Sequence, residues 1–358
     1  MKSNDSRLTL LLAQFGRHEF SNRFLKYLES TSCPFPIIYA DGDADGYSKE
    51  VCQKFKNELN ITLIEYKQNI KFKDYFTMVV KGLEEVQTPY VMLCDNDDFI
   101  IYSAVYKLLS FLEKHPEYIS AGSPKSEIQL DDFSTKCYGN FATIYRSYAH
   151  FRDHEPLDTF EEQIEKTFLE FQPNFYNIFK KDVLLTIWKE ILELDFSDLT
   201  IMEFYYQLRS TTLGKQYADP SICHYIRQTG TGSWESKTYD FSKELVYNNL
   251  PKDIRKVAKK ISMICNEDFD SDSQKIYTTI LDSYAKHLNN YLPHNVMRYR
   301  FSKLYNIKVF LMKIFKRLTL VRNARFFLIE KKVLAIYAKT KRDAFKEFKL
   351  EVGRIKSI

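Results

Sequence analysis

The sequence predicts an α/β fold, in which a parallel sheet is flanked by helices and followed by a helical C-terminal extension. Over the first 115 residues, short apolar runs alternate with helical patterns of ten or more residues. Two of these apolar runs end in acidic loops. Residues 236–358 have a helical pattern instead. We therefore expect βαβ units first and helices afterwards.

Four apolar runs have the length and composition of buried strands, at residues 8–12, 36–39, 61–66 and 90–94. Large apolar side chains at helical spacing predict helices over residues 19–29, 47–59, 75–86 and 103–114. Right-handed crossovers would place the carboxyl ends of the strands, with Phe15, Asp41 and Asp95, along one edge of the sheet. Open α/β sheets bind their ligands at that edge.

The strand predicted at 90–94 ends in four polar residues, Asp95, Asn96, Asp97 and Asp98. If the backbone stays extended, Asp95 and Asp97 lie on one face. Two neighbouring carboxylates repel each other unless a cation lies between them. Oxygen ligands suit Mg²⁺ or Mn²⁺, which in turn bind substrate phosphates. The pattern indicates either such a metal site or a solvated acidic turn.

Composition limits the class of protein. Hydrophobic residues make up 44% and charged residues 28% of the chain, which is typical of a folded protein. The six cysteines include no Cys-x-x-Cys pair, so neither a zinc site nor a disulfide framework is indicated. The first apolar run is too short for a signal peptide, and no window of 18 apolar residues exists. We expect a cytoplasmic protein without a spanning helix.

Three segments of the N-terminal region together resemble GT-A fold glycosyltransferases of family 2. They are LTLLLAQFGRHEF at the first strand, YADGDADG at the second and LCDNDDF at the fourth. Their order and spacing match the family. The chain departs from it at Ala13-Gln14-Phe15-Gly16, where the family usually has Pro-Thr-Tyr-Asn, and in the acidic loop, which is not Asp-Asp-Gly-Ser.

The resemblance implies a mixed GT-A sheet and a nucleotide-sugar donor. It implies that a divalent metal, Mn²⁺ or Mg²⁺, binds the donor pyrophosphate at the Asp-x-Asp motif. Asp97 would be the more direct metal ligand, with Asp95 nearer the ribose. Asp41 would face the nucleotide base and Phe15 the neighbouring wall of that pocket.

Basic residues near this edge have two interpretations. Arg17, Lys71 and Lys73 would assist at the donor phosphates if the resemblance extends to them. The alternative is a solvated surface charge for each of them.

The resemblance also implies a catalytic base in the acceptor half, residues 116–235. In the family an acidic residue heads a helix that ends about eleven residues later at a Gly, and Glu203 and Gly214 reproduce that distance. Glu203 would then accept the proton of the acceptor hydroxyl. Asp198 is the competing candidate. The alternative is a helix cap for Asp198 and a surface acid for Glu203.

Two further residues are candidates at the donor phosphates or the metal. His224 and Arg227 follow what we expect to be the last strand, where the family commonly places such residues. Residues 229–234 form a Gly-containing loop with a Trp that would suit a lid. His150 and His154 are four residues apart, but we expect surface residues there rather than a metal site.

The C-terminal part is strongly basic. Residues 297–358 contain 18 Lys and Arg against four Asp and Glu, a net charge of +14. Residues 308–321 place apolar side chains in one arc of a helix and Lys and Arg on the other half. Such a helix lies on an anionic membrane surface or docks on a partner, unless it packs in a core. No nucleic-acid module accompanies the charge, so we expect no nucleic-acid partner.

These patterns predict a GT-A catalytic domain at 1–235, with its nucleotide-sugar half at 1–115, and a helical basic region at 236–358. The predicted function is glycosyl transfer to a glycan or lipid-linked glycan acceptor in surface polysaccharide synthesis, at the inner face of the cell membrane. A non-catalytic sugar-binding or partner-binding protein of this fold is one alternative. A phosphatase of the haloacid-dehalogenase kind is another, although it would carry its Asp-x-Asp motif on the first strand, followed by Gly and Thr.

Overall fold

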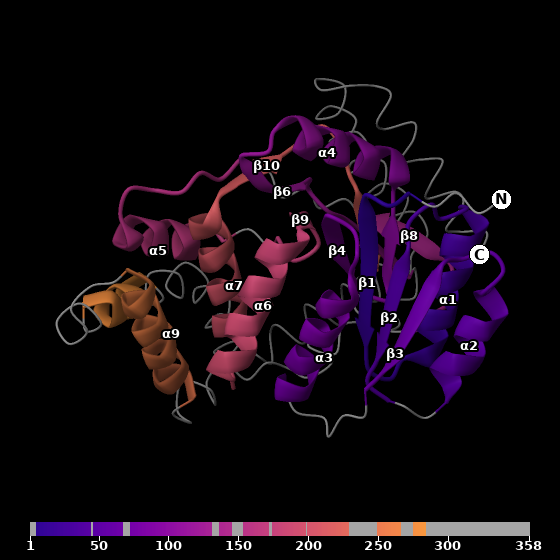
Figure 1. Ribbon diagram of the computed structural model, residues 1–358, viewed down its shortest axis with the longest axis horizontal. Helices are drawn as coiled ribbons and strands as arrows, with labels where there is room; N and C mark the ends of the chain where they lie inside the picture. The colour runs from indigo at the N-terminus through magenta and orange to yellow at the C-terminus, as the bar shows by residue number, and fades with distance from the viewer. Residues whose placement is uncertain are drawn as a thin grey trace, which may run out of the picture.

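The structure is a computed structural model. It describes residues 5–43, 46–66, 72–130, 136–144, 153–171, 174–197, 199–228, 249–265 and 275–283. Two β-sheets and the helices packed on them make up this part of the chain (Figure 1).

The main sheet has seven strands in the order β10-β6-β9-β4-β1-β2-β3. Their bounds are β1 Leu8–Gln14, β2 Ile37–Asp41, β3 Ile61–Glu65, β4 Tyr90–Cys94, β6 Tyr118–Gly122, β9 Ile178–Lys180 and β10 Lys215–Ala218. The first three strands and β4 pair in parallel, whereas β9 is antiparallel to both β4 and β6. The sheet is therefore mixed, as the GT-A resemblance implies. The parallel sheet expected from the βαβ pattern is wrong at β9, which runs antiparallel to its neighbours.

Helices cover both faces of this sheet, which is why its central strands are apolar on both sides (Figure 1). One face packs on α1 His18–Ser30, α2 Tyr47–Phe55 and α4 Tyr102–Lys114. The other packs on α3 Phe72–Glu85, α6 Lys181–Leu194 and α7 Leu199–Leu213, with α5 Phe160–Leu169 alongside. Trp188, fully buried on α6, lies against Phe76 of α3 and fixes these two helices together.

A second sheet has four strands in the order β5-β11-β7-β8. Their bounds are β5 Asp98–Ile100, β7 Ser126–Leu130, β8 Phe141–Ile144 and β11 Tyr225–Gln228. Strand β5 begins at the last residue of the acidic motif and pairs with β11. The sequence analysis placed His224 and Arg227 after the last strand, which is wrong, because Arg227 lies within β11.

Part of the region predicted as a separate C-terminal unit packs on the main fold. Helix α9 Asn249–Cys265 contributes Ile254 and Ile261, and residues 275–283 contribute Ile276 and Ile280, to the same core as α6 and α7. The predicted boundary at 235 falls among residues 229–248, outside the described residues. The division into domains therefore remains a prediction.

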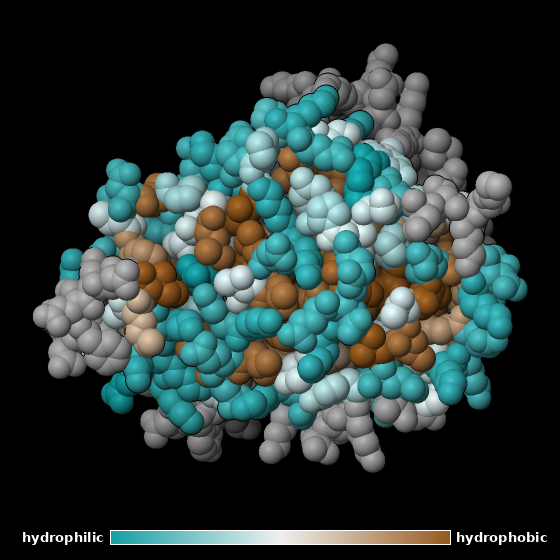
Figure 2. Space-filling view, in the orientation of Figure 1, coloured by the Kyte–Doolittle hydropathy of each residue, from teal (hydrophilic) through white to brown (hydrophobic). Residues whose placement is uncertain are grey.

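Seen in the same orientation, much of the surface is hydrophilic, and hydrophobic residues show in patches across its middle (Figure 2). Among the described residues, no helix is both long and apolar enough to span a membrane. The basic segment 297–358, its predicted amphipathic helix and the predicted lid at 229–234 all lie outside the described residues.

Candidate active site

A tight turn at the end of β4 organises the acidic motif. The Asp98 amide donates to the Asp95 carbonyl at 3.2 Å, and the Asp98 carboxyl accepts from the Asp95 amide at 3.3 Å. The backbone thus reverses at Asn96 and Asp97 instead of continuing as a strand. The premise of an extended backbone was wrong, and the carboxyl groups converge because the chain turns.

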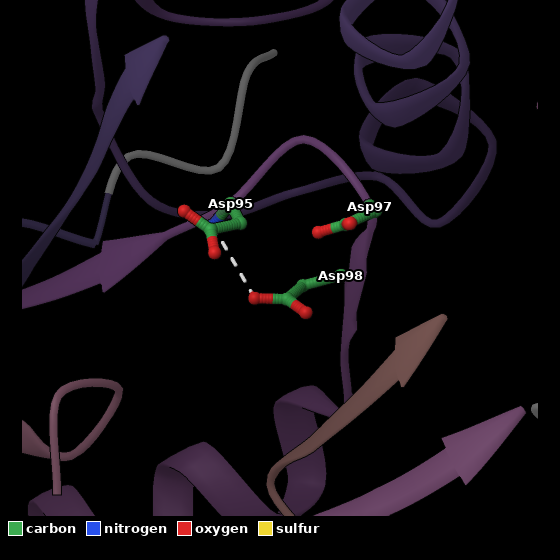
Figure 3. A group of neighbouring side chains, drawn as sticks. All are labelled: Asp95, Asp97 and Asp98. Atoms are coloured by element: carbon green, nitrogen blue, oxygen red, sulfur yellow. Dashed lines mark hydrogen bonds between the residues drawn. The ribbon is translucent and has the colours of Figure 1, made fainter. Parts of the chain in front are cut away.

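The turn gathers three carboxyl groups. One oxygen each of Asp95, Asp97 and Asp98 lies within 4.8 Å of the others. Figure 3 shows Asp97 and Asp98 pointing toward Asp95. Asp97 and Asp98 are buried, while Asp95 is partly exposed. Of these three, the sequence analysis named only Asp95 and Asp97 as metal candidates, and Asp98 lies with them in this cluster.

The cluster fits a hard divalent cation. All its donors are carboxyl oxygens, the ligands that Mg²⁺ and Mn²⁺ prefer. The Asp98 Oδ1 atom is buried and has no hydrogen-bond partner among the described residues. A buried carboxyl oxygen left in this way is costly, and a cation would relieve that cost.

Two arginines offset part of the negative charge. The Arg17 guanidinium donates to Asp97 at 2.9 Å, and that of Arg227 lies 3.6 Å from Asp95. Arg17 reaches the cluster because it lies just before α1 in a left-handed conformation with φ of 60°, and its guanidinium stacks on Phe20. Both arginines predicted near the donor phosphates are therefore at the acidic cluster.

The electrostatics of the cluster reflect burial. Burial raises the pKa of Asp95, opposed by the charge of Arg227 and reinforced by that of Asp97. Burial also raises the pKa of Asp98 well above its usual range, with added repulsion from Asp97 and Asp95. Uncompensated carboxylates this close do not all ionise together.

Tyr176 is a site residue that the sequence analysis missed. Its hydroxyl donates to Asp95, and its ring lies beside the Arg227 guanidinium. The antiparallel register of β9, in which Ile178 pairs with Met92, brings the residues before β9 level with the end of β4. No local sequence signal marks Tyr176, because 81 residues separate it from Asp95.

His224 is not part of the acidic cluster but contacts Tyr176, whose hydroxyl bonds to Asp95. The ring is fully buried, with Nε2 at 2.9 Å from the Tyr176 carbonyl and Nδ1 at 2.6 Å from the Ser123 hydroxyl. Because a carbonyl can only accept, Nε2 carries the proton and Nδ1 accepts from Ser123. Both nitrogens are engaged, so we leave His224 out of the metal site that we propose.

The buried His224 should make stability depend on pH. Burial lowers the pKa of His224 to about 4. In the unfolded chain it would titrate at about 6.5. The unfolded state then binds the extra proton first, so stability present above pH ~6.5 is lost as pH falls toward ~4, by about 1.4 kcal/mol per unit.

Urea unfolding at several pH values measures this slope. The His224→Gln variant should show a shallower decline than the wild type over that range. If stability falls equally steeply with pH in the two proteins, His224 is not the source of this pH dependence.

Asp41 ends β2, which β1 separates from β4 at the same edge of the sheet. It is fully buried, and its Oδ1 accepts from Gln14 at 2.9 Å and from the Asp43 amide at 3.1 Å. Its Oδ2 is buried with no hydrogen-bond partner among the described residues. Phe15, in the loop after β1, is 40% exposed, as a residue open to a ligand would be. An acceptor oxygen thus remains at the position predicted for the nucleotide base.

The structure does not bring Lys73 to the cluster. Lys73 is exposed at the start of α3 and pairs with Asp195, at the end of α6, at 3.7 Å. We therefore do not retain it as a phosphate ligand. Lys71 and Asp198 lie outside the described residues.

Glu203 is exposed in the second turn of α7. Burial raises the pKa of Tyr75 on α3, and the negative charges of Asp95 and Glu203 add to the rise. Helix α7 leads into the start of β10, which is parallel to β6, so the N-terminal part of α7, with Glu203, lies toward the carboxyl edge of the sheet. Tyr75, like Tyr176, was not singled out from the sequence.

An ion pair braces the helix that carries Glu203. The Arg209 guanidinium makes two hydrogen bonds to Glu190 of α6, at 2.7 and 2.9 Å, and the Tyr205 hydroxyl donates to Glu190 at 2.8 Å. Both charged side chains are largely buried. Paired buried charges hold a fixed geometry, so α7 keeps a defined orientation against α6.

A mixed α/β sheet flanked by helices, with an acidic turn after a central strand, defines a GT-A-like fold. The haloacid-dehalogenase alternative expects its motif on the first strand, whereas β1 ends in Gln14 and the acidic turn follows β4.

Comparison with known proteins agrees with this class. The family described as "Glycosyl transferase family 2" matches residues 20–187. The resemblance to GT-A glycosyltransferases of family 2 is thereby confirmed, and the match supports a glycosyltransferase. No curated protein sequence matches the chain.

Solved structures of S. aureus TarS are similar in fold. TarS residues 1–349 in complex with UDP-GlcNAc align with a TM-score of 0.50 at 12% identity, covering 78% of this chain and 72% of that one. A longer TarS structure aligns with a TM-score of 0.49 at 10% identity over 78% of this chain. This chain covers only 43% of that longer structure.

Proposed function

We propose that the protein transfers a sugar from a nucleotide-sugar donor to a glycan or lipid-linked glycan acceptor in surface polysaccharide synthesis, with Mn²⁺ or Mg²⁺ bound. The observation that carries the proposal is the Asp95, Asp97 and Asp98 cluster at the carboxyl edge of β4. Arg17 and Arg227 flank it, and Asp41 lies on the same edge. Donor-binding residues and a candidate base thus line one side of the sheet.

Each residue has a role in this proposal. The metal, when bound to Asp97 with Asp95 and Asp98, supplies Lewis-acid stabilisation of the pyrophosphate as it leaves. Asp41 accepts a hydrogen bond from the nucleotide base beside Phe15. Arg17 and Arg227 pair with the donor phosphates, a use suited to guanidinium groups. Glu203, with Asp198 as the alternative, takes the proton of the acceptor hydroxyl.

The proposed acceptor and the proposed location of the protein are both inferred from the charge of its C-terminal segment. The basic segment 297–358 favours an anionic surface, which is where a lipid-linked acceptor would be presented. We accordingly propose a cytoplasmic protein peripheral to the inner face of the cell membrane.

A binding screen tests the proposed donor class. Thermal unfolding would be measured with Mn²⁺ and a panel of nucleotide sugars, starting with UDP-sugars because TarS was solved with UDP-GlcNAc. A ligand at 100 times its Kd stabilises the folded state by about 2.7 kcal/mol, so a clear rise in Tm is expected with the true donor. No rise with any member of the panel contradicts the proposal.

The same samples separate the enzyme from a binding module. Release of the nucleoside diphosphate in the presence of acceptor is expected of the enzyme. Donor binding without release over a range of acceptors would favour the non-catalytic alternative.

A further inference from the structure

Four buried side chains form a continuous chain of hydrogen bonds along the carboxyl edge of the sheet. The Asn96 side-chain amide donates to the Ser21 hydroxyl at 3.0 Å, and that hydroxyl donates to the side-chain oxygen Oε1 of Gln14 at 3.0 Å. The side-chain nitrogen Nε2 of Gln14 then donates to the Asp41 carboxylate at 2.9 Å. All four side chains are at least 95% buried. We call this set the Asp41–Asn96 relay.

The sheet register builds the relay. Gln14 pairs with Asp41 across β1 and β2, so their side chains emerge together. Leu12 pairs with Cys94 across β1 and β4, which brings the end of β1 level with the turn that contains Asn96. Ser21, in the first turn of α1, closes the remaining gap. The order β4-β1-β2 is therefore crossed by one polar path.

The two ends of the relay have different partners. At one end, Asp41 keeps a buried oxygen with no hydrogen-bond partner among the described residues. At the other end, Asn96 is the residue between Asp95 and Asp97 and lies in the turn that positions both carboxyl groups. The donors all point the same way along the relay, toward Asp41.

We propose that Gln14, Ser21 and Asn96 are positioning residues that couple the base-binding carboxylate Asp41 to the acidic turn. Breaking a buried hydrogen bond leaves a polar group unsatisfied, so a shift at one end of the relay is passed on rather than absorbed. Filling the base site then favours the turn geometry that binds the metal, and the converse follows by linkage. This inference rests on the proposed function.

The test uses uridine and Mn²⁺, because a nucleoside has no phosphate that can bind the metal directly. The relay variants separate coupling through the relay from any contact between the ribose and Asp95. Free Mn²⁺ would be followed by electron paramagnetic resonance, with and without saturating uridine. For the wild type we expect uridine to tighten Mn²⁺ binding about fivefold, at the lower end of usual coupling between sites. For Ser21→Ala, whose changed side chain is in the middle of the relay, the factor should fall below about twofold.

Two further variants make the result specific. Gln14→Met removes the two hydrogen bonds that Gln14 makes in the relay, to Ser21 and to Asp41, and should lose the coupling as Ser21→Ala does. Thr9→Val is the matched control, because Thr9 is also buried on β1 and bonds another side chain, Thr88, at 2.7 Å, but at the opposite end of the strand. It should keep the wild-type factor.

The outcomes separate the two proposals. If the wild type binds neither Mn²⁺ nor any nucleotide sugar, the proposed function fails and the relay has nothing to couple. If the wild type binds Mn²⁺ and uridine without coupling, or if Ser21→Ala keeps the full coupling, the relay proposal fails while the proposed function stands.

Discussion

Replacing Asp97 by alanine should abolish metal-dependent donor turnover while leaving the protein folded. Asp97 is fully buried between Asp95 and Asp98 and in contact with the Arg17 guanidinium. Its carboxylate is therefore the group best placed to hold a cation over the donor phosphates. Removing one such electrostatic contact at a reacting centre typically costs about 10²–10³-fold in rate. We expect a loss in that range or beyond it.

Folding of this variant is not at risk from the change itself. The alanine removes repulsion among three clustered carboxyl groups, and the partly exposed Arg17 loses one partner. The Tm should stay near that of the wild type. Nucleoside diphosphate release with Mn²⁺ measures the activity. The control is Asp182→Asn, whose side chain is 95% exposed on α6. Unchanged turnover in Asp97→Ala would contradict the proposal that Asp97 binds the catalytic metal.

The N-terminal half of the fold could be predicted from the sequence because its signals are local. The strand predicted at 90–94 is β4 Tyr90–Cys94, and the helix predicted at 103–114 is α4 Tyr102–Lys114. Apolar runs and helical spacing alone determine such elements. The helix predicted at 47–59 ends earlier, at Phe55, since helix ends depend on capping rather than on periodicity.

The geometry of the acidic motif could not be predicted in the same way. An extended Asp95 and Asp97 would share a face, but the chain turns at Asn96 and re-enters a sheet as β5. That return depends on pairing with β11, which lies more than 120 residues later in the sequence. Tertiary pairing of this kind overrides local extension. The cluster was predicted, but for a different geometric reason.

Partners of the site residues were the least predictable part. Arg17 and Arg227 were candidates from the sequence, yet the hydroxyl of Tyr176 and the buried amides of Gln14 and Asn96 were not. Each of these three acts through a residue on another element. Conversely, Lys73 was a candidate at the donor phosphates and pairs with Asp195 instead. Side-chain partners of this kind follow from sheet order, which the sequence alone does not specify.

Replacing Glu203 by glutamine should lower turnover far more than donor affinity. The amide keeps the shape of the side chain but cannot accept the acceptor proton, and general base catalysis is typically worth about 10²–10⁴-fold. Glu203 is exposed in the N-terminal part of α7, so an acceptor can reach it from solvent. The Kd for the donor, measured without acceptor, should change less than about twofold, because the proton transfer takes place only when acceptor is bound.

The control for this prediction is Glu193→Gln, an exposed acid at the end of α6 that pairs with Lys260 and should retain full activity. Asp198→Asn decides between the two candidate bases. If Asp198→Asn alone loses turnover while Glu203→Gln retains it, the base is Asp198 and the position of Glu203 near Tyr75 is incidental. If Glu203→Gln alone loses turnover, helix α7 carries the base in its second turn rather than at its first residue. The Arg209–Glu190 brace then has a catalytic consequence, because it fixes the orientation from which Glu203 meets the acceptor.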